Sequence, residues 1–142
     1  MKVTVLGFVV VSCVLMLGCS NPFGPTNYEM VSGLRAVPEN MTVKLDGEQP
    51  FSVYSDRGHL DDIEVHISGP EVSDPVCRCA KKVELGRLDK VGSDRFIYYA
   101  PGQVPSGISL PTTVEVYASS SYHTSAIIDK NYKTIAQITI VE

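Results

Sequence analysis

The stretch from residue 113 to 119, TVEVYAS, indicates the fold class because its residues alternate between apolar and polar. Val114, Val116 and Ala118 share one parity, and more polar residues separate them. Successive side chains of a β-strand point to opposite faces of a sheet, so this period of two predicts a strand with one buried face.

The same alternation recurs on both sides of this stretch. It is found at residues 41–45, 51–54, 63–68, 96–100 and 136–140. Glycine and proline turn formers separate these segments, and no window has the 3.6-residue period of a long amphipathic helix. Parallel neighbours would need long crossover connections that the spacing does not allow. We therefore predict an all-β fold, an antiparallel β-sandwich of about seven strands.

Length and charge restrict the class of protein further. The 142 residues fit one domain, and the net charge is −4, with 16 acidic against 12 basic residues. The longest run of basic residues is the pair Lys81–Lys82. Nucleic-acid binding depends on clustered basic residues that release counterions, so we expect no nucleic-acid partner.

The N-terminus predicts export. Residues 3–18 carry no charge, and a helix of this length spans roughly 24 Å, less than the roughly 30 Å hydrocarbon core of a bilayer. A signal peptide is therefore favoured over a permanent membrane span. Two alternatives stay open, namely a secretory signal cut by the ordinary signal peptidase and an uncleaved anchor.

The end of this run, LMLGC at residues 15–19, resembles the lipobox of bacterial lipoproteins. The resemblance implies that residues 1–18 are removed and that Cys19 carries the lipid that holds the protein to a membrane. Ser20 stands where an inner-membrane retention signal would place Asp, so the resemblance implies the bacterial cell envelope and, by default, the outer membrane. We expect a lipidated tether at residues 19–33 and the folded domain at residues 34–142.

The second half of the chain also resembles bacterial immunoglobulin-like modules. The matching segments are FIYYAP at residues 96–101, VP at 104–105, TVEVYAS at 113–119 and AQITI at 136–140. The first half fits more loosely, through residues 37–43, 49–53 and 63–69. The family often has Trp in the third strand, and this chain has none, so a smaller residue must fill that core position. The resemblance implies an immunoglobulin-like sandwich over residues 34–142 and says little about function.

Cys77 and Cys79 form the most unusual cluster in the sequence. In an extended strand their Cα atoms would lie about 6.5 Å apart, near the outer limit for a disulfide, and a bend would make the bridge easier to form. We mark the pair as a candidate disulfide. Two separate thiols, a redox pair activated by nearby basic residues, or a metal site completed by His59 and His66 are the alternatives.

A tyrosine- and serine-rich region provides the candidate contact surface. Tyr117, Tyr122 and His123 lie in or beside the run ASSSYHTS at residues 118–125, a composition typical of binding loops. No Gly-x-Ser-x-Gly, His-Glu-x-x-His or carboxylate pair indicates catalysis, so we expect no enzyme, no catalytic residue and no cofactor.

The preferred hypothesis is a non-enzymatic envelope lipoprotein that contacts another protein or an envelope polymer through its loops. Its rival is a periplasmic thiol-redox or metal-binding lipoprotein that uses Cys77 and Cys79. A carbohydrate-binding module is a third hypothesis.

Overall fold

The computed structural model describes residues 31–56, 60, 63–120 and 132–142, and its regular structure consists almost entirely of β-strands. In chain order the strands are β1 (Leu34–Val37), β2 (Asn40–Lys44), β3 (Glu48–Ser55), β4 (Ile63–Ser68), β5 (Glu71–Ser73), β6 (Ala80–Lys82), β7 (Arg87–Lys90), β8 (Arg95–Tyr99), β9 (Thr112–Ser120) and β10 (Tyr132–Val141). The prediction of an all-β fold is confirmed. Within the described residues, no helix has the length and hydrophobicity that a membrane crossing requires.

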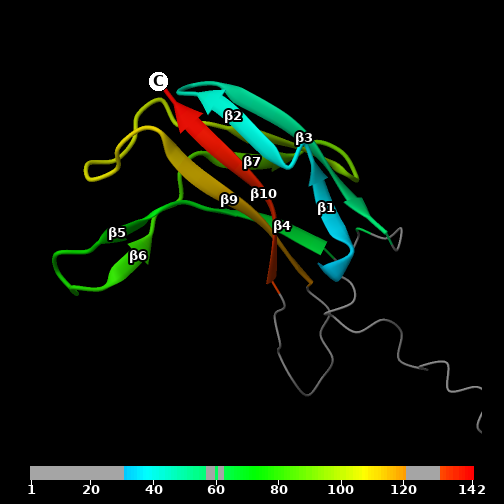
Figure 1. The fold of residues 1–142 in the computed structure, drawn as a ribbon, viewed down its shortest axis with the longest axis horizontal. Helices are drawn as coiled ribbons and strands as arrows, with labels where there is room; N and C mark the ends of the chain where they lie inside the picture. Colours follow the sequence, from blue (N-terminus) through cyan, green and yellow to red (C-terminus); the bar gives the residue numbers. More distant parts are fainter. Residues whose placement is uncertain (1–30, 57–59, 61–62, 121–131) are drawn as a thin grey trace, which may run out of the picture.

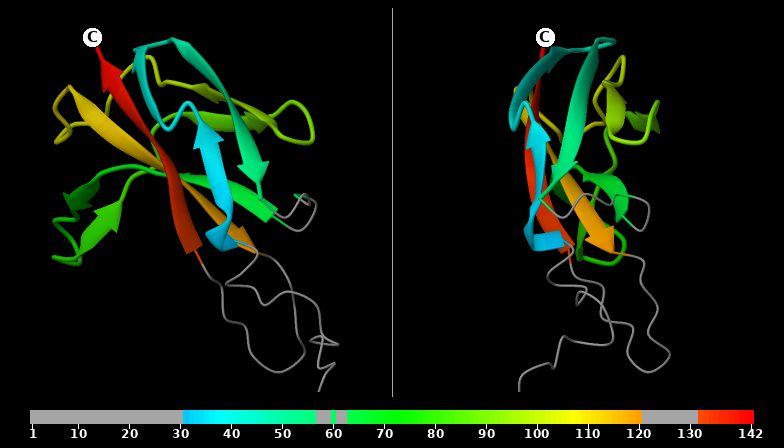
Figure 2. Two further views of the ribbon diagram at one scale, coloured as in Figure 1. Left: turned by 45° about the vertical axis from the view of Figure 1, so that its right-hand side comes forward. Right: turned by 90° about the vertical axis from the view of Figure 1, so that its right-hand side faces the viewer.

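Eight of these strands form two four-stranded sheets that face each other (Figure 2). One sheet has the order β1-β3-β8-β7 and the other has the order β2-β10-β9-β4. These orders match the ABED and GFC sheets of immunoglobulin sandwiches, with β2 added beside β10. The remaining two strands, β5 and β6, form a hairpin that stands away from the sandwich (Figure 1).

One strand pair departs from the all-antiparallel expectation. β2 runs parallel to β10, with Met41 beside Ile138 and Val43 beside Ile140. The expectation excluded parallel pairs because short connections cannot join them. Here the pair joins the two ends of the domain, so nearly the whole fold serves as the connection.

The strand count exceeds the prediction because β1, β5, β6 and β7 lie outside the alternating segments from which the strands were predicted. β1 pairs with β3 in one sheet, whereas β2 pairs with β10 in the other. Pro38 lies between them and has no N–H to continue a ladder, so the chain changes sheets there. β6 and β7 read AKK and RLDK, which show no apolar alternation.

The core lies between the two sheets and follows the parity of the predicted strands. Val114, Val116 and Ala118 of β9 and Ile138 and Ile140 of β10 are completely buried. The other sheet contributes Phe51 of β3 and Phe96 of β8 from its inner face. These two rings stack on each other with centroids 5.6 Å apart. In β4 only Ile63 is fully buried, and Val65 and Ile67 are half-buried because this strand is at the sheet edge.

Candidate functional site

The outward-facing side chains of β4, β9 and β10 form an aromatic cluster, His66, Tyr117 and Tyr132. Burial of Val116 and Ala118 leaves Tyr117, between them, on the outer face. Strand pairing places His66 directly opposite Tyr117. Their ring centroids are 5.3 Å apart and the rings are stacked, while Tyr132 meets Tyr117 edge-on at 5.7 Å.

A hollow of about 340 Å³ lies beside this cluster. Its lining combines rings, hydroxyls and two opposite charges, from Ser68, Lys82, Glu115, Tyr117, Tyr132 and Thr134. Lys82 belongs to the β5–β6 hairpin, and its Nζ lies 3.9 Å from Glu115 Oε2 on β9. The hollow therefore lies between the hairpin and the outer face of the sheet, and it offers apolar ring surface next to hydrogen-bonding groups.

Burial and, to a smaller extent, neighbouring ionisable groups affect the Tyr117 hydroxyl. The pKa of the Tyr117 hydroxyl is raised, first by partial burial and then by Tyr132 and the carboxylate of Glu84. His66 Nε2 lies 3.3 Å from Glu64 Oε2, on the same exposed face of β4. At neutral pH Tyr117 is thus a neutral hydroxyl that can donate or accept a hydrogen bond.

The structure places one of the three predicted contact residues in this cluster. Tyr117 is on the sheet face, whereas Tyr122 and His123 lie outside the described residues. Sequence reasoning missed Tyr132 and considered His66 as a ligand in the metal alternative. The polar parity of both His66 and Tyr117 was visible in the sequence, but only the strand register shows that their rings meet.

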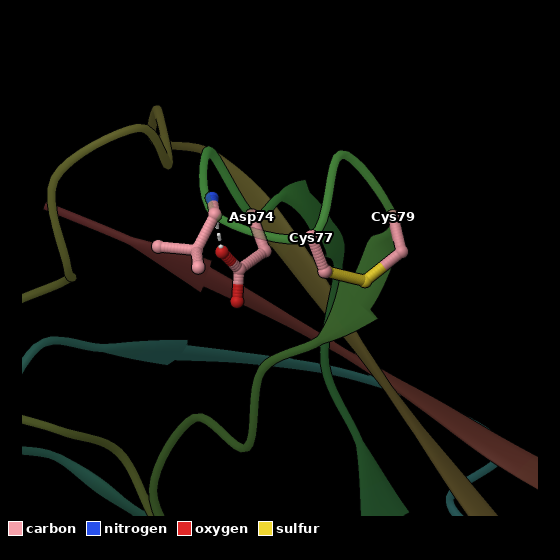
Figure 3. Close-up of a disulfide and its surroundings, with 4 residues drawn as sticks. Asp74, Cys77 and Cys79 are labelled. Carbon is pink, nitrogen blue, oxygen red and sulfur yellow. Dashed lines mark hydrogen bonds between the residues drawn. A yellow bond between two sulfur atoms is a disulfide. The ribbon is translucent and has the colours of Figure 1, made fainter.

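Cys77 and Cys79 form a disulfide in the turn between β5 and β6 (Figure 3). Their Cα atoms are 5.2 Å apart, closer than the extended spacing, because the chain turns at Arg78, whose φ is 54°. Asp74 organises the same turn: its carbonyl accepts a hydrogen bond from the Arg78 N–H at 2.9 Å, and its Oδ1 accepts one from the Val76 N–H at 2.8 Å.

The other sequence predictions for sites lie partly outside the described residues. Cys19 precedes them, and His59, one of the two histidines of the metal alternative, also falls outside. In the part of the chain that the structure describes, no three His, Cys, Asp or Glu side chains come together as a metal site would require. His66 is engaged by Tyr117 and Glu64, on the sheet face.

No protein-family model matches the chain, and no curated protein matches its sequence.

Proposed function

We propose that the protein is a non-enzymatic, lipid-anchored module of the bacterial cell envelope that binds another envelope protein or an envelope polymer. The binding surface in this proposal is the outer face of β4, β9 and β10, rather than the loops alone. The observation that carries it is the aromatic cluster of His66, Tyr117 and Tyr132 beside the charged hollow.

The composition of this face supports a binding role. Tyrosine offers a large, rigid contact area and a hydroxyl at low cost in conformational entropy. Tyr132 is 58% exposed, so its ring is accessible to a partner. The Lys82–Glu115 pair is half-exposed, and such surface pairs contribute little stability, so either charge can turn to a ligand at small cost.

The position of the chain ends favours the sheet face over the residues between β9 and β10, which include Tyr122 and His123. Lys133 Nζ donates to the backbone carbonyls of Ser32 at 2.6 Å and Leu34 at 2.8 Å, which ties the start of the domain to the start of β10. The C-terminus lies at the opposite end of the sandwich (Figure 1). With a lipid on Cys19, the end where β9 leads into β10 would face the membrane. The sheet face, which begins at Tyr132 near that end and continues to the hollow at Lys82 and Glu115, would stand to the side and stay open to partners.

Site-specific photo-crosslinking tests the proposal in the full-length, membrane-inserted protein. Tyr132 is replaced by the photoreactive amino acid benzoylphenylalanine, and the matched control carries it at Tyr54, which is 45% exposed on the outer face of the other sheet. We expect a light-dependent protein adduct at position 132 and none at position 54.

A polymer partner requires a second assay. In this case we expect the protein to sediment with purified cell-wall polymer and Tyr132→Ala, but not Tyr54→Ala, to weaken this several-fold. Equal behaviour of the two positions in both assays would contradict the proposed surface.

A further inference from the structure

The Cys77–Cys79 disulfide lies at an exposed position. It is in the turn of the β5–β6 hairpin, which projects from the sandwich (Figure 1), and every residue from 75 to 82 is exposed. Val76, next to Cys77, is 92% exposed. Thiol–disulfide exchange requires a thiolate to reach a sulfur atom, and exposed disulfides are the ones that undergo it readily.

This disulfide contributes little to the fold. It closes a loop over a single residue, Arg78, and so removes little conformational entropy from the unfolded chain. The hairpin is already held by the pairing of Glu71 with Lys82 and Ser73 with Ala80. The Asp74 N–H also donates to the Cys79 carbonyl at 3.0 Å. The disulfide therefore adds little to the stability of the hairpin.

The residues around the bridge favour its opening. Arg78 has a positive φ of 54°, which a non-glycine residue rarely adopts, so opening the ring relieves a constraint on its backbone. Arg78 lies between the cysteines and Lys81 follows two residues after Cys79, and such cations stabilise a departing thiolate. The one carboxylate in the turn, Asp74, accepts a hydrogen bond from the Val76 N–H, which offsets part of its negative charge.

From these observations we infer that Cys77 and Cys79 form a thiol–disulfide exchange site that oxidises paired cysteine thiols of exported proteins. This stoichiometric exchange is separate from the proposed binding face, and it rests on the proposed function only for the envelope location that makes exported proteins its partners. The co-reactant is a protein or peptide dithiol.

The exchange proceeds in two balanced steps. A thiolate of the dithiol attacks one sulfur of the bridge; the Cys77–Cys79 bond breaks, a mixed disulfide forms, and the electron pair leaves on the other cysteine as a thiolate. The second thiol of the partner, deprotonated, then attacks the partner's own sulfur in the mixed disulfide and expels the remaining cysteine thiolate. The partner loses two electrons and two protons, and Cys77 and Cys79 gain both as two thiols. Each molecule thus oxidises one dithiol and is left with two thiols, so the reaction is stoichiometric.

The test uses the purified lipidated protein and, as probe, a synthetic peptide with two cysteine thiols. We expect stoichiometric oxidation of the peptide, at a rate about tenfold or more above that with the same concentration of oxidised glutathione. The double variant Cys77→Ser/Cys79→Ser should not oxidise the peptide. Circular dichroism establishes that this variant is folded.

Two further variants address the mechanism. Cys79→Ser keeps one thiol, and after activation with a pyridyl disulfide it should hold a peptide with a single cysteine as a stable mixed disulfide visible by mass spectrometry, whereas the two-cysteine peptide should be released as its own disulfide. Arg78→Gly keeps both sulfurs. It removes the positive charge, and glycine adopts a positive φ without a conformational penalty, so peptide oxidation should slow several-fold. A bridge that reacts no faster than oxidised glutathione, or peptide oxidation that persists in the double serine variant, would overturn the inference. Neither result would bear on crosslinking at Tyr132.

Discussion

The hydroxyl of Tyr98 donates a hydrogen bond of 2.7 Å to the backbone carbonyl of Leu85. Both residues are almost completely buried, so the bond joins β8 to the segment that leads into β7 inside the core. A buried carbonyl without a partner is costly, and this single contact therefore fixes how the chain enters the outermost strand of its sheet.

Replacing Tyr98 by Phe tests this contact. Tyr98→Phe keeps the ring but leaves the Leu85 carbonyl without its donor, and we expect a loss of about 1–3 kcal/mol in the free energy of unfolding. The measurement is urea denaturation followed by circular dichroism. Tyr99→Phe, with its ring on the outer face under the Arg87 guanidinium, is the control and should change stability little. Equal losses in the two variants would contradict the assignment.

The raised pKa of Tyr98 predicts how the stability of the fold changes at alkaline pH. Burial raises the pKa of Tyr98 from 10.0 to about 12. Between these values the unfolded chain loses the proton while the folded chain keeps it, so the folded state binds more protons and stability falls as pH rises. Its contribution is complete below pH 10 and disappears progressively toward pH 12. Tyr98→Phe should flatten this decline when unfolding is measured from pH 9 to 12, and an unchanged slope would refute the prediction.

Ile138 of β10 tests the core. Its side chain is completely buried against the opposite sheet, so Ile138→Ala removes buried apolar surface and leaves a cavity. We expect a loss of roughly 2–4 kcal/mol. Gln137→Ala, the exposed neighbour on the same strand, should stay within about 0.5 kcal/mol of the parent in the same denaturation experiment.

Substitutions at two glycines with positive φ distinguish the stability cost of backbone strain from the additional cost of steric crowding. At Gly86 the φ is 83° and an added Cβ would lie 2.3 Å from the Tyr99 carbonyl oxygen; at Gly107 the φ is 95° and nothing lies within 4 Å. Gly107→Ala should cost about 1 kcal/mol, the conformational penalty alone. Gly86→Ala should cost clearly more, because the backbone must also move. Thermal unfolding of the two variants checks this order, and the reverse order would be a contradiction.

The proposed anchor has a direct chemical test. In cells fed an alkyne-bearing palmitate, Cys19→Ala should abolish labelling and leave residues 1–18 attached, because the acylated cysteine is the substrate of the lipoprotein peptidase. Cys77→Ser should label like the parent. Labelling that survives Cys19→Ala would exclude this cysteine as the site.

The strands and their buried faces could be predicted from the sequence because they depend on local alternation. Val114, Val116 and Ala118 needed only their spacing to be assigned to the core, as did Phe96 and Tyr98. The short strand β6 could not be predicted, since Ala80–Lys82 shows no apolar alternation and has no buried residue, and its pairing with β5 is what makes it a strand.

The candidate sites show the same division. The sequence marked Tyr117 and the cysteine pair as unusual, since residue type and spacing are local properties. The contact of Tyr117 with His66, 51 residues earlier, depends on the register of β4 against β9, and the hollow depends on how the hairpin brings Lys82 to Glu115. These arrangements arise from long-range strand pairing, whose energy is shared among many residues, so only the tertiary structure could reveal them.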